Sequence, residues 1–411
     1  MSVYVDSEIG RLKRVIVHSP GTEIERMTPE SARQLLYHDI IPISVVSREH
    51  EKLKAFLSQI SEVYEMKDLV ASVINATGEA KAAVVQAISP DERAGELIRL
   101  GADELVGTLI GGLPARRHTL TDYLSERLYD IPPLPNLYFM RDGAMVFRDR
   151  VLVGAMAHRV RVNESLLLKA AFSYVPQLDS EGILFDGMLE GGGDVRLEGG
   201  DFMPVSPNTL VLGVSERSSA EAVDRLVHHL TDTFAEPFHI FVVMLPHEPS
   251  TIHLDMVFTL IDHHTALVYA PYVLGPKRLR VLRMDVSPGR PTLIRDVSGL
   301  IEGLAELGVE VEPVLCGGES EVYQQREQWM SGTNVLAVAP GKIVGYDCNV
   351  ATADACADAG FTVRPVDVFL CGEEHIDDHE RLLVLTPGVE LARGGGGARC
   401  MTLPVEREPI C

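Results

Sequence analysis

A cysteine follows a run of four glycines close to the C-terminal end of the sequence. The glycines occupy positions 394–397, Arg393 precedes them, and Ala398, Arg399 and Cys400 follow. Ordering four glycines is costly, so a folded loop here requires positive φ angles or close backbone approach. Flanking arginines favour the thiolate, the nucleophilic form of cysteine. The segment predicts a reactive thiol facing a cleft, and a flexible tail with a small buried cysteine is the alternative.

A histidine and an aspartate lie two positions apart in the segment 252–255, just before an apolar run. If this segment begins a strand, His253 and Asp255 lie on the same face of it. They could then supply a base and an anchoring carboxylate to one pocket. Two alternatives stay open: ligation of a metal together with Cys400, and a structural histidine beside a surface aspartate.

Two further motifs place carboxylates just before apolar runs. Glu198 and Asp201 flank a glycine pair, and Asp142 closes the segment 136–142. Taken singly, each motif is typical of a turn with solvated acids. Combined with a cysteine and a histidine, they fit a guanidinium substrate, which is planar, cationic and rich in N–H donors. A thiolate would attack its central carbon while an acid/base group protonates the departing nitrogen.

Composition limits the classes of function. The chain has 411 residues, and 37 Lys plus Arg against 59 Asp plus Glu give a formal net charge of −22. This charge repels phosphate backbones and favours small cations, so we expect no nucleic-acid partner. No apolar run approaches the roughly 18–20 residues of a membrane-spanning helix, and no signal-peptide pattern is present. Cysteines without CxxC spacing argue against a zinc ribbon or disulfide scaffold, so we expect a cytoplasmic protein without membrane contact.

The elements that must position these residues follow a repeating pattern. Pairs of apolar runs around a short polar turn predict β-hairpins at 144–153, 201–212, 254–269 and 334–346. A helix is predicted over 218–234, with Ser218 or Ser219 as its cap. The recurring unit of hairpin plus helix indicates a closed or stacked repeat architecture of the α/β class.

Residues 66–130 break this pattern. Short helices are predicted over 66–77, 79–88, 91–100 and 119–129, joined by glycine and proline signals. The proline-rich exit at 131–135 suits a stiff linker. We therefore expect an α-helical insertion domain at 66–130 within an α/β domain formed by residues 1–65 and 131–411.

Taken in order along the chain, the motifs resemble those of the arginine deiminase family, within the superfamily of guanidine-modifying enzymes. The matching segments are 9–17, 136–142, 198–201, 253–259, 329–334 and 394–407. The resemblance implies a five-bladed α/β propeller with an inserted α-helical domain, and that insertion favours deiminases over dimethylarginine hydrolases. It also implies hydrolysis of L-arginine to L-citrulline and ammonia through a covalent cysteine–thiouronium intermediate, without metal or organic cofactor.

The resemblance also assigns roles to individual residues. Cys400 matches the nucleophile, His253 the general acid/base and Glu198 its partner. Asp142 and Asp255 match the carboxylates that grip the guanidinium. The positions that match contacts to the rest of the substrate are Asn136, Phe139, Arg161 and Arg217. The carboxylate of the substrate is expected to pair with the two arginines. The alternative is that each arginine forms an ordinary ion pair at the surface.

Three positions depart from the family pattern: Met140 stands where Thr is usual, Gly143 where Pro is frequent, and His38 within an entrance-loop motif. They leave the exact guanidino substrate open, so the alternative is an amidinotransferase or a deiminase of another guanidino compound. A silent guanidine-binding protein and a metal-dependent hydrolase are further alternatives. Also left open are whether Arg393 or Arg399 gates the site, whether the role is catabolic or biosynthetic, and whether the chain forms a homo-oligomer.

Overall fold

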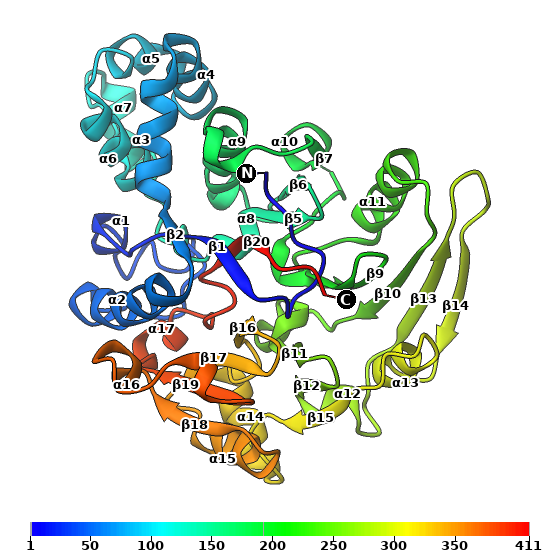
Figure 1. Ribbon diagram of the computed structural model, residues 1–411. Coiled ribbons are helices and arrows are strands. Elements are labelled where there is room, and N and C mark those ends of the chain that lie inside the picture. Colours follow the sequence, from blue (N-terminus) through cyan, green and yellow to red (C-terminus); the bar gives the residue numbers. More distant parts are fainter. Residues whose placement is uncertain (1, 192, 411) are drawn as a thin grey trace.

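The computed structural model describes residues 2–191 and 193–410 and shows a mixed α/β fold. Within these residues, five sheets of three to five strands surround the centre of the molecule, and the helices lie mainly on the outside (Figure 1). No helix of the described chain combines the length and apolar character needed to cross a bilayer.

The five sheets repeat one connection: an antiparallel hairpin, then a crossover to a third strand that pairs in parallel. The second sheet holds β5 (Ala144–Phe147), β6 (Arg150–Val153) and β7 (Ile183–Asp186). The third holds β8 (Phe202–Ser206), β9 (Thr209–Val214), β10 (Phe238–Met244), β13 (Val281–Val286) and β14 (Leu293–Val297). The fourth holds β11 (Phe258–Asp262), β12 (Thr265–Val268) and β15 (Glu312–Leu315), and the fifth β16 (Leu336–Ala339), β17 (Lys342–Tyr346), β18 (Thr362–Pro365) and β19 (Leu382–Thr386).

The first sheet joins the two ends of the chain. Its strands are β1 (Leu12–Val17), β2 (Glu62–Glu65) and β20 (Leu403–Arg407). β20 pairs antiparallel with β1, and β1 pairs parallel with β2, so the chain termini together supply the same unit that the other sheets form locally. Strands β5, β12 and β16 are buried along their length, which explains their continuous apolar runs rather than strict alternation.

The helices of the described chain have the following bounds: α1 (Thr22–Glu25), α2 (Ile43–Ile60), α3 (Met66–Ala76), α4 (Gly78–Ile88), α5 (Asp91–Leu97), α6 (Ala102–Gly111), α7 (Leu120–Leu124), α8 (Met140–Gly143), α9 (Val162–Tyr174), α10 (Gly187–Glu190), α11 (Ala220–Thr233), α12 (Ala270–Val273), α13 (Leu300–Ala305), α14 (Glu321–Trp329), α15 (Val350–Asp358), α16 (Asp367–Leu370) and α17 (Val389–Arg393). Single 3₁₀ turns are η1 (Arg159–Arg161), η2 (Pro176–Leu178), η3 (Gly199–Asp201), η4 (Pro249–Thr251), η5 (Leu254–Met256) and η6 (Ile376–Asp378).

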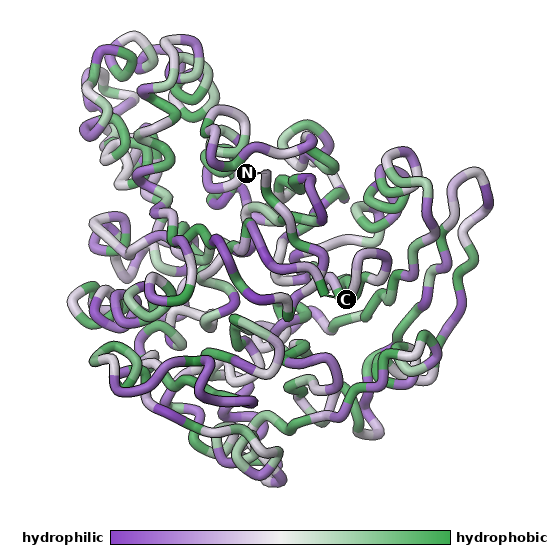
Figure 2. The backbone as a smooth tube through the Cα atoms, in the orientation of Figure 1, coloured by the Kyte–Doolittle hydropathy of each residue, from purple (hydrophilic) through white to green (hydrophobic). Residues whose placement is uncertain are grey.

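The helices α3 to α7 form the block at the upper left of Figure 1, and β3 (Leu113–Pro114) pairs there with β4 (Tyr129–Ile131). Figure 2 shows hydrophobic and hydrophilic segments alternating along these helices, as amphipathic helices require. Their apolar faces share one buried cluster with α9, through residues such as Leu69, Leu105 and Leu167. The block therefore packs on the helix that follows the hairpin β5–β6.

Most of the predicted elements are confirmed, but the bounds of two are wrong and two further elements had not been predicted. The hairpins at 144–153, 201–212 and 334–346 and the helix α11, capped by Ser219, are present. The hairpin predicted over 254–269 begins only at Phe258, because residues 254–256 form η5. The predicted helix 119–129 shortens to α7 and gives way to β4. Helix α6 and the hairpin of β13 with the exposed strand β14 had not been predicted.

Candidate active site

In each of the five sheets, the antiparallel strand pair of the repeated unit is preceded by one residue with a polar or nucleophilic side chain. All five of these residues are buried. Asp142 lies in α8 before β5, Glu198 before η3 and β8, and His253 before η5 and β11. Asn334 precedes β16, and Cys400 precedes β20. Because the repeated units place these strands around one centre, residues far apart in sequence meet there (Figure 1).

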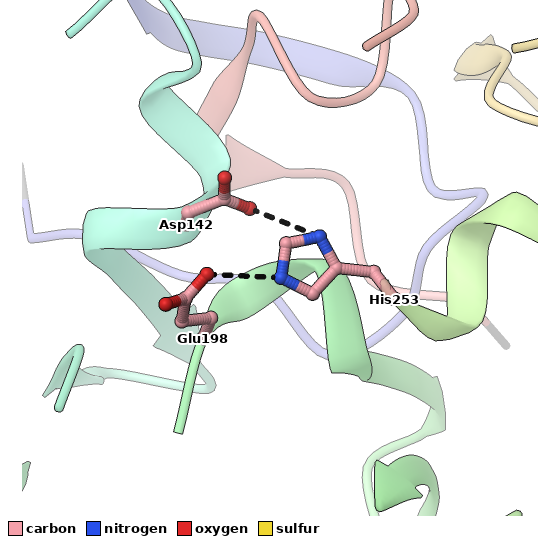
Figure 3. Close-up of side chains that lie close together, drawn as sticks. All are labelled: Asp142, Glu198 and His253. Atoms are coloured by element: carbon pink, nitrogen blue, oxygen red, sulfur yellow. Dashed lines mark hydrogen bonds and ion pairs between the residues drawn. The ribbon is translucent and has the colours of Figure 1, made fainter. Parts of the chain in front are cut away.

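His253 lies between two carboxylates (Figure 3). Its Nε2 is 3.0 Å from Glu198 Oε2, and its Nδ1 is 3.8 Å from Asp142 Oδ1. Burial alone would lower the pKa of His253, but Asp142 and Glu198 outweigh burial and raise this pKa to about 9. Arg217 and His253 in turn hold the pKa of Glu198 well below its usual value. The imidazole is therefore protonated at neutral pH and able to act as a proton donor.

Cys400 is 4% exposed, and its Sγ lies 3.6 Å from Asp255 Oδ2. Burial, together with the charges of Asp255 and Asp142, raises the pKa of the thiol well above its usual value, against the opposing effect of Arg399. Arg399 therefore favours the thiolate as predicted, but burial and the two carboxylates outweigh it. A cation bound next to the two carboxylates would offset their effect on the thiol.

Asp142 and Asp255 share an arrangement that suits a guanidinium. Oδ2 of Asp142 accepts a hydrogen bond from Arg161 Nη1 at 2.7 Å, and Oδ2 of Asp255 accepts one from Arg399 Nη1 at 2.8 Å. In both carboxylates the other oxygen, Oδ1, is buried without a hydrogen-bond partner. A buried acceptor without a donor is costly, and a guanidinium offers several N–H donors.

A cavity of about 880 Å³ opens over this centre. Seven of the nine residues singled out from the sequence line it: Cys400, His253, Asp142, Asn136, Phe139, Arg161 and Arg217. Glu198 and Asp255 lie behind its wall and contact it through His253 and Cys400. The structure thus brings the whole predicted set together, although a larger cavity of about 1060 Å³ between α12 and α14 contains neither a cysteine nor a histidine.

Arg161 and Arg217 are buried, so the surface ion pair considered for them is wrong. Arg161 bonds to Asp142 and to Glu164 Oε2, the latter at 2.9 Å from its Nε. Arg217 Nη1 lies 3.3 Å from Glu198 Oε2. Both arginines therefore brace carboxylates from the cavity side, and contact with a substrate carboxylate stays a prediction.

The four glycines before Cys400 are ordered by close packing. Gly395 has a φ of +100°, which favours glycine. A Cβ at Gly394 would clash with the Tyr138 hydroxyl, one at Gly396 with the Phe139 ring, and one at Gly397 with the backbone of Asn334. The alternative of a flexible tail is therefore wrong.

The segment 252–255 is not a strand, in contrast to the prediction. Leu254 begins η5, and its backbone N–H donates to Asp201 Oδ1 at 2.8 Å. This long-range hydrogen bond stabilises a turn that local sequence does not reveal. His253 and Asp255 still reach the same centre, because the turn directs one toward Glu198 and the other toward Cys400.

The two arginines of the cysteine loop differ in environment. Arg399 is fully buried, with Nε 3.0 Å from Glu8 Oε1 and Nη1 2.8 Å from Asp255. Arg393 lines the cavity and pairs with Glu390 and with Asp39 of the entrance segment. Of the two gate candidates named from the sequence, Arg393 is the one at the cavity.

Of the three departures from the family pattern, one faces the cavity. Met140 is buried in the core, and a side chain at Gly143 would meet Leu168 Cδ1. His38 lines the cavity, and its ring lies 5.9 Å from that of Trp329. Among these positions, His38 is therefore the one placed to contact a substrate.

Some residues of the centre had not been assigned a role from the sequence. Glu8 and Glu164 hold Arg399 and Arg161, and no local signal distinguishes them from surface acids. Asn334 contacts Cys400 and lies within the motif 329–334, which carried the resemblance without an assigned role. Proximity to the cysteine is visible only in three dimensions.

A metal site is the remaining alternative. Asp142, Glu198 and His253 place ligand atoms within 4.8 Å of one another, without Cys400. However, Arg161 and Arg217 lie within 3.8 Å of these carboxylates and already neutralise them. The arrangement suits an organic cation next to a thiol better than a divalent ion.

Comparison with known proteins shows the family to which this chain belongs. A family model described as arginine deiminase matches residues 114–407. Curated arginine deiminases from Listeria welshimeri and Latilactobacillus sakei are 31% and 29% identical, each covering 99% of this chain and 98% of the relative.

Solved structures share the fold at low identity. The amidinotransferase SxtG from Microseira wollei has a TM-score of 0.57 at 14% identity and covers 99% of this chain and 98% of its own. The substrate-bound N-terminal domain of ArgZ, a cyanobacterial arginine dihydrolase, has a TM-score of 0.54 at 15% identity and covers 97% and 99%. From the family match and the full-length similarity, this chain belongs to the arginine deiminase family.

Proposed function

We propose that this protein hydrolyses L-arginine to L-citrulline and ammonia. The observation that carries the proposal is one cavity lined by a buried cysteine, a protonated histidine and Asp142, with Asp255 directly behind the cysteine. Both carboxylates keep a buried oxygen without a hydrogen-bond partner. Full-length similarity to curated arginine deiminases supports the same reaction. The cavity would receive the guanidinium at its buried end and the amino-acid portion toward Arg161, Arg217, Asn136 and Phe139.

Substrate binding prepares the nucleophile. The guanidinium donates hydrogen bonds to Oδ1 of Asp142 and of Asp255, which removes the cost of leaving these acceptors unpaired. Its positive charge also offsets the two carboxylates that raise the pKa of the Cys400 thiol. The thiolate is thus stabilised when the electrophile is in place.

The reaction then proceeds in two halves. The Cys400 thiolate forms a C–S bond to the guanidinium carbon, and the C–N bond of a terminal nitrogen breaks as His253 donates its proton and ammonia leaves. His253, now neutral, takes a proton from a water molecule that attacks the thiouronium carbon. The C–S bond breaks, the thiolate is restored, and the water oxygen stays on the carbon. Its remaining proton passes to solvent, where the released ammonia takes it up as ammonium, and the oxygen becomes the ureido carbonyl of citrulline. Glu198 stabilises the imidazolium throughout.

An amidinotransferase is the second candidate, because SxtG shares the fold. That enzyme class passes the amidino group to an amine instead of water. Ornithine released from arginine only in the presence of an acceptor amine would indicate transfer, whereas ammonia and citrulline without an acceptor indicate deimination. A panel of guanidino compounds with both readouts identifies the substrate.

The finer architecture belongs to the same proposal. We propose that the five sheets are the blades of an α/β propeller, closed where β20 pairs with β1. We also propose that residues 66–130 are an inserted helical domain on a catalytic domain of residues 1–65 and 131–411. The repeated hairpin-plus-crossover unit supports the first statement, and the segregated helices α3 to α7 support the second.

Replacement Cys400→Ser tests the mechanism. A hydroxyl in this site stays protonated, so citrulline formation should fall below detection while calorimetry still detects arginine binding. Replacement Cys371→Ser, at an exposed cysteine, is the matched control and should keep full activity. Citrulline formation near the wild-type rate by the Cys400 variant would remove the proposed mechanism.

A further inference from the structure

Asn334 makes two hydrogen bonds to Cys400, one to its side chain and one to its backbone. Nδ2 of Asn334 lies 3.0 Å from Cys400 Sγ, and Oδ1 lies 3.0 Å from the Cys400 backbone nitrogen. Asn334 is 1% exposed and precedes β16, on the sheet that neighbours β1 and β20. No other described side chain donates a hydrogen bond to this sulfur.

The backbone contact fixes the orientation of the amide. A backbone N–H can only donate, so the atom of Asn334 that faces it must be the acceptor oxygen Oδ1. The amide nitrogen then necessarily points at the sulfur and donates to it. A donor aimed at sulfur favours the charged thiolate over the neutral thiol, because hydrogen bonds to ions are the stronger ones.

We propose that Asn334 is a further catalytic residue of this site, whose amide N–H binds the sulfur of Cys400 as a thiolate and as a leaving group. The inference rests on the proposed deiminase reaction and deepens it. Its physical basis is an imbalance: Asp255, 3.6 Å from the sulfur, and Asp142 disfavour negative charge there. Asn334 donates a hydrogen bond to the sulfur from a neutral amide. It therefore adds no cation that would compete with the substrate guanidinium for Asp142 and Asp255.

The donor is held in place before reaction. The Asn334 backbone N–H bonds to the Ser331 carbonyl at 3.0 Å, and Ser331 has a φ of +58° within a tight turn. Gly397 packs against the Asn334 backbone so closely that a Cβ would clash. Because the amide cannot reorient without breaking both contacts to Cys400, its stabilisation of the sulfur costs no reorganisation during the reaction.

The amide acts in both halves of the reaction. In the first half the hydrogen bond lowers the pKa of the thiol and so raises the fraction of thiolate. A thiolate of lower pKa is a weaker nucleophile, but this loss is smaller than the gain in thiolate fraction, so attack is faster. In the second half the C–S bond breaks and the electron pair returns to sulfur. A sulfur of lower pKa leaves faster, so the same N–H bond assists hydrolysis of the thiouronium.

Replacement Asn334→Asp separates this role from a structural one. The carboxylate has the same shape, and one oxygen still accepts the Cys400 backbone N–H, but the donor to sulfur is replaced by a negative charge. Replacement Asn334→Ala removes the donor without adding charge. It provides the same test if the charge introduced by Asn334→Asp prevents folding. Replacement Thr402→Val is the matched control, because Thr402 Oγ1 braces the same loop through the carbonyls of Ala398 and Arg399 without touching the sulfur.

The measurement is the pH dependence of alkylation of the substrate-free protein by iodoacetamide, with folding checked by circular dichroism. Loss of a hydrogen bond to an ion should raise the midpoint for the thiol by about one to two pH units in both Asn334 variants. Thr402→Val should leave the midpoint unchanged. With arginine at pH 7, kcat should fall about 10- to 100-fold in the Asn334 variants.

An unchanged midpoint in both Asn334 variants, or a shift matched by Thr402→Val, would overturn the assignment. The alkylation assay does not depend on the identity of the substrate. If wild-type protein made no citrulline but the midpoint still shifted, the proposed function would fail while the contact between Asn334 and the sulfur stood.

Discussion

Two buried histidines of this chain have nearly the same neighbours, but only one lies beside the cavity. His253 sits 3.0 Å from Glu198 and 3.8 Å from Asp142, whereas His18 sits 3.2 Å from Glu23 and 3.4 Å from Glu65. In both, the carboxylates outweigh burial and raise the pKa of the imidazole to about 9. A buried imidazolium between two carboxylates is therefore not in itself a sign of catalysis.

The two sites differ in whether a carboxylate oxygen is left without a hydrogen-bond partner. Around His18, Glu23 also accepts the Gly21 backbone N–H, and Glu65 accepts from Ser19 and Lys54. Around His253, Asp142 keeps one buried oxygen without a hydrogen-bond partner and lines a cavity that also contains a thiol. Carboxylates that keep no buried oxygen without a partner, such as Glu23 and Glu65, stabilise the fold, whereas a carboxylate with such an oxygen beside a cavity is prepared for a ligand.

The sharpest test of this comparison replaces each histidine by glutamine. His253→Gln removes the proton donor, so kcat for citrulline formation should fall about 10²- to 10⁴-fold. His18→Gln should leave kcat within about threefold but lower the free energy of unfolding by about 3–5 kcal/mol, the usual cost of breaking a buried ion pair. Citrulline assays and urea unfolding measure the two effects. Equal losses of kcat in both variants would break the comparison.

A second test compares the two carboxylates that keep an unpartnered oxygen. Asp142→Asn and Asp255→Asn each replace a charged acceptor for the guanidinium with a neutral one. Each should lower kcat/KM for arginine about 10- to 100-fold, since a hydrogen bond to a charged group contributes about 1.5–3 kcal/mol. Asp377→Asn, at an exposed carboxylate outside the cavity, is the control and should keep kcat/KM unchanged. An undiminished kcat/KM in both test variants would mean that the guanidinium binds elsewhere.

Both histidines should contribute to the pH dependence of the free energy of unfolding. A histidine pKa raised from 6.5 to about 9 in the folded state contributes stability that is fully present below about pH 6.5. That contribution is lost as pH rises through about 9, when the folded protein also releases the proton. Urea unfolding between pH 6 and pH 9.5 should therefore show a decline that becomes shallower in His18→Gln and in His253→Gln. A decline that is as steep in both variants as in the wild type would contradict these pKa values.

The sequence was sufficient to identify the residues of the site, but not to predict the local structure and the electrostatics around them. Glu198 and His253 stood out because they precede or begin predicted hairpins, and Cys400 because it follows the four glycines. The structure brings all three residues to one centre. The turn at 254–256 was predicted as a strand, because its stabilising partner, Asp201, lies 53 positions away. The raised pKa of the Cys400 thiol was equally invisible, since its causes are burial in the folded protein and the charges of Asp255 and Asp142, which are distant in the chain.

The missed elements have similar physical causes. Helix α6 contains Gly107 and ends at Gly111, which lowers its intrinsic helix propensity, but Leu105 and Leu109 are fully buried and stabilise it by packing. Strand β14 is mostly exposed and carries charged residues, so it lacks the apolar pattern used to recognise strands. Tertiary contacts override local preference in both.

The smallest expected effect extends the comparison to the arginines of the cysteine loop. Arg399 is fully buried between two carboxylates, whereas Arg393 is partly exposed at the cavity and pairs with Asp39 and Glu390. Exposed ion pairs contribute about 0–1 kcal/mol, so Arg393→Gln should change KM for arginine less than about fivefold and leave kcat unaltered. Steady-state citrulline kinetics at low and high salt measure this. A fall in kcat of more than about tenfold would instead give Arg393 a part in closing the site, because a rim charge that only attracts substrate acts on binding and not on turnover.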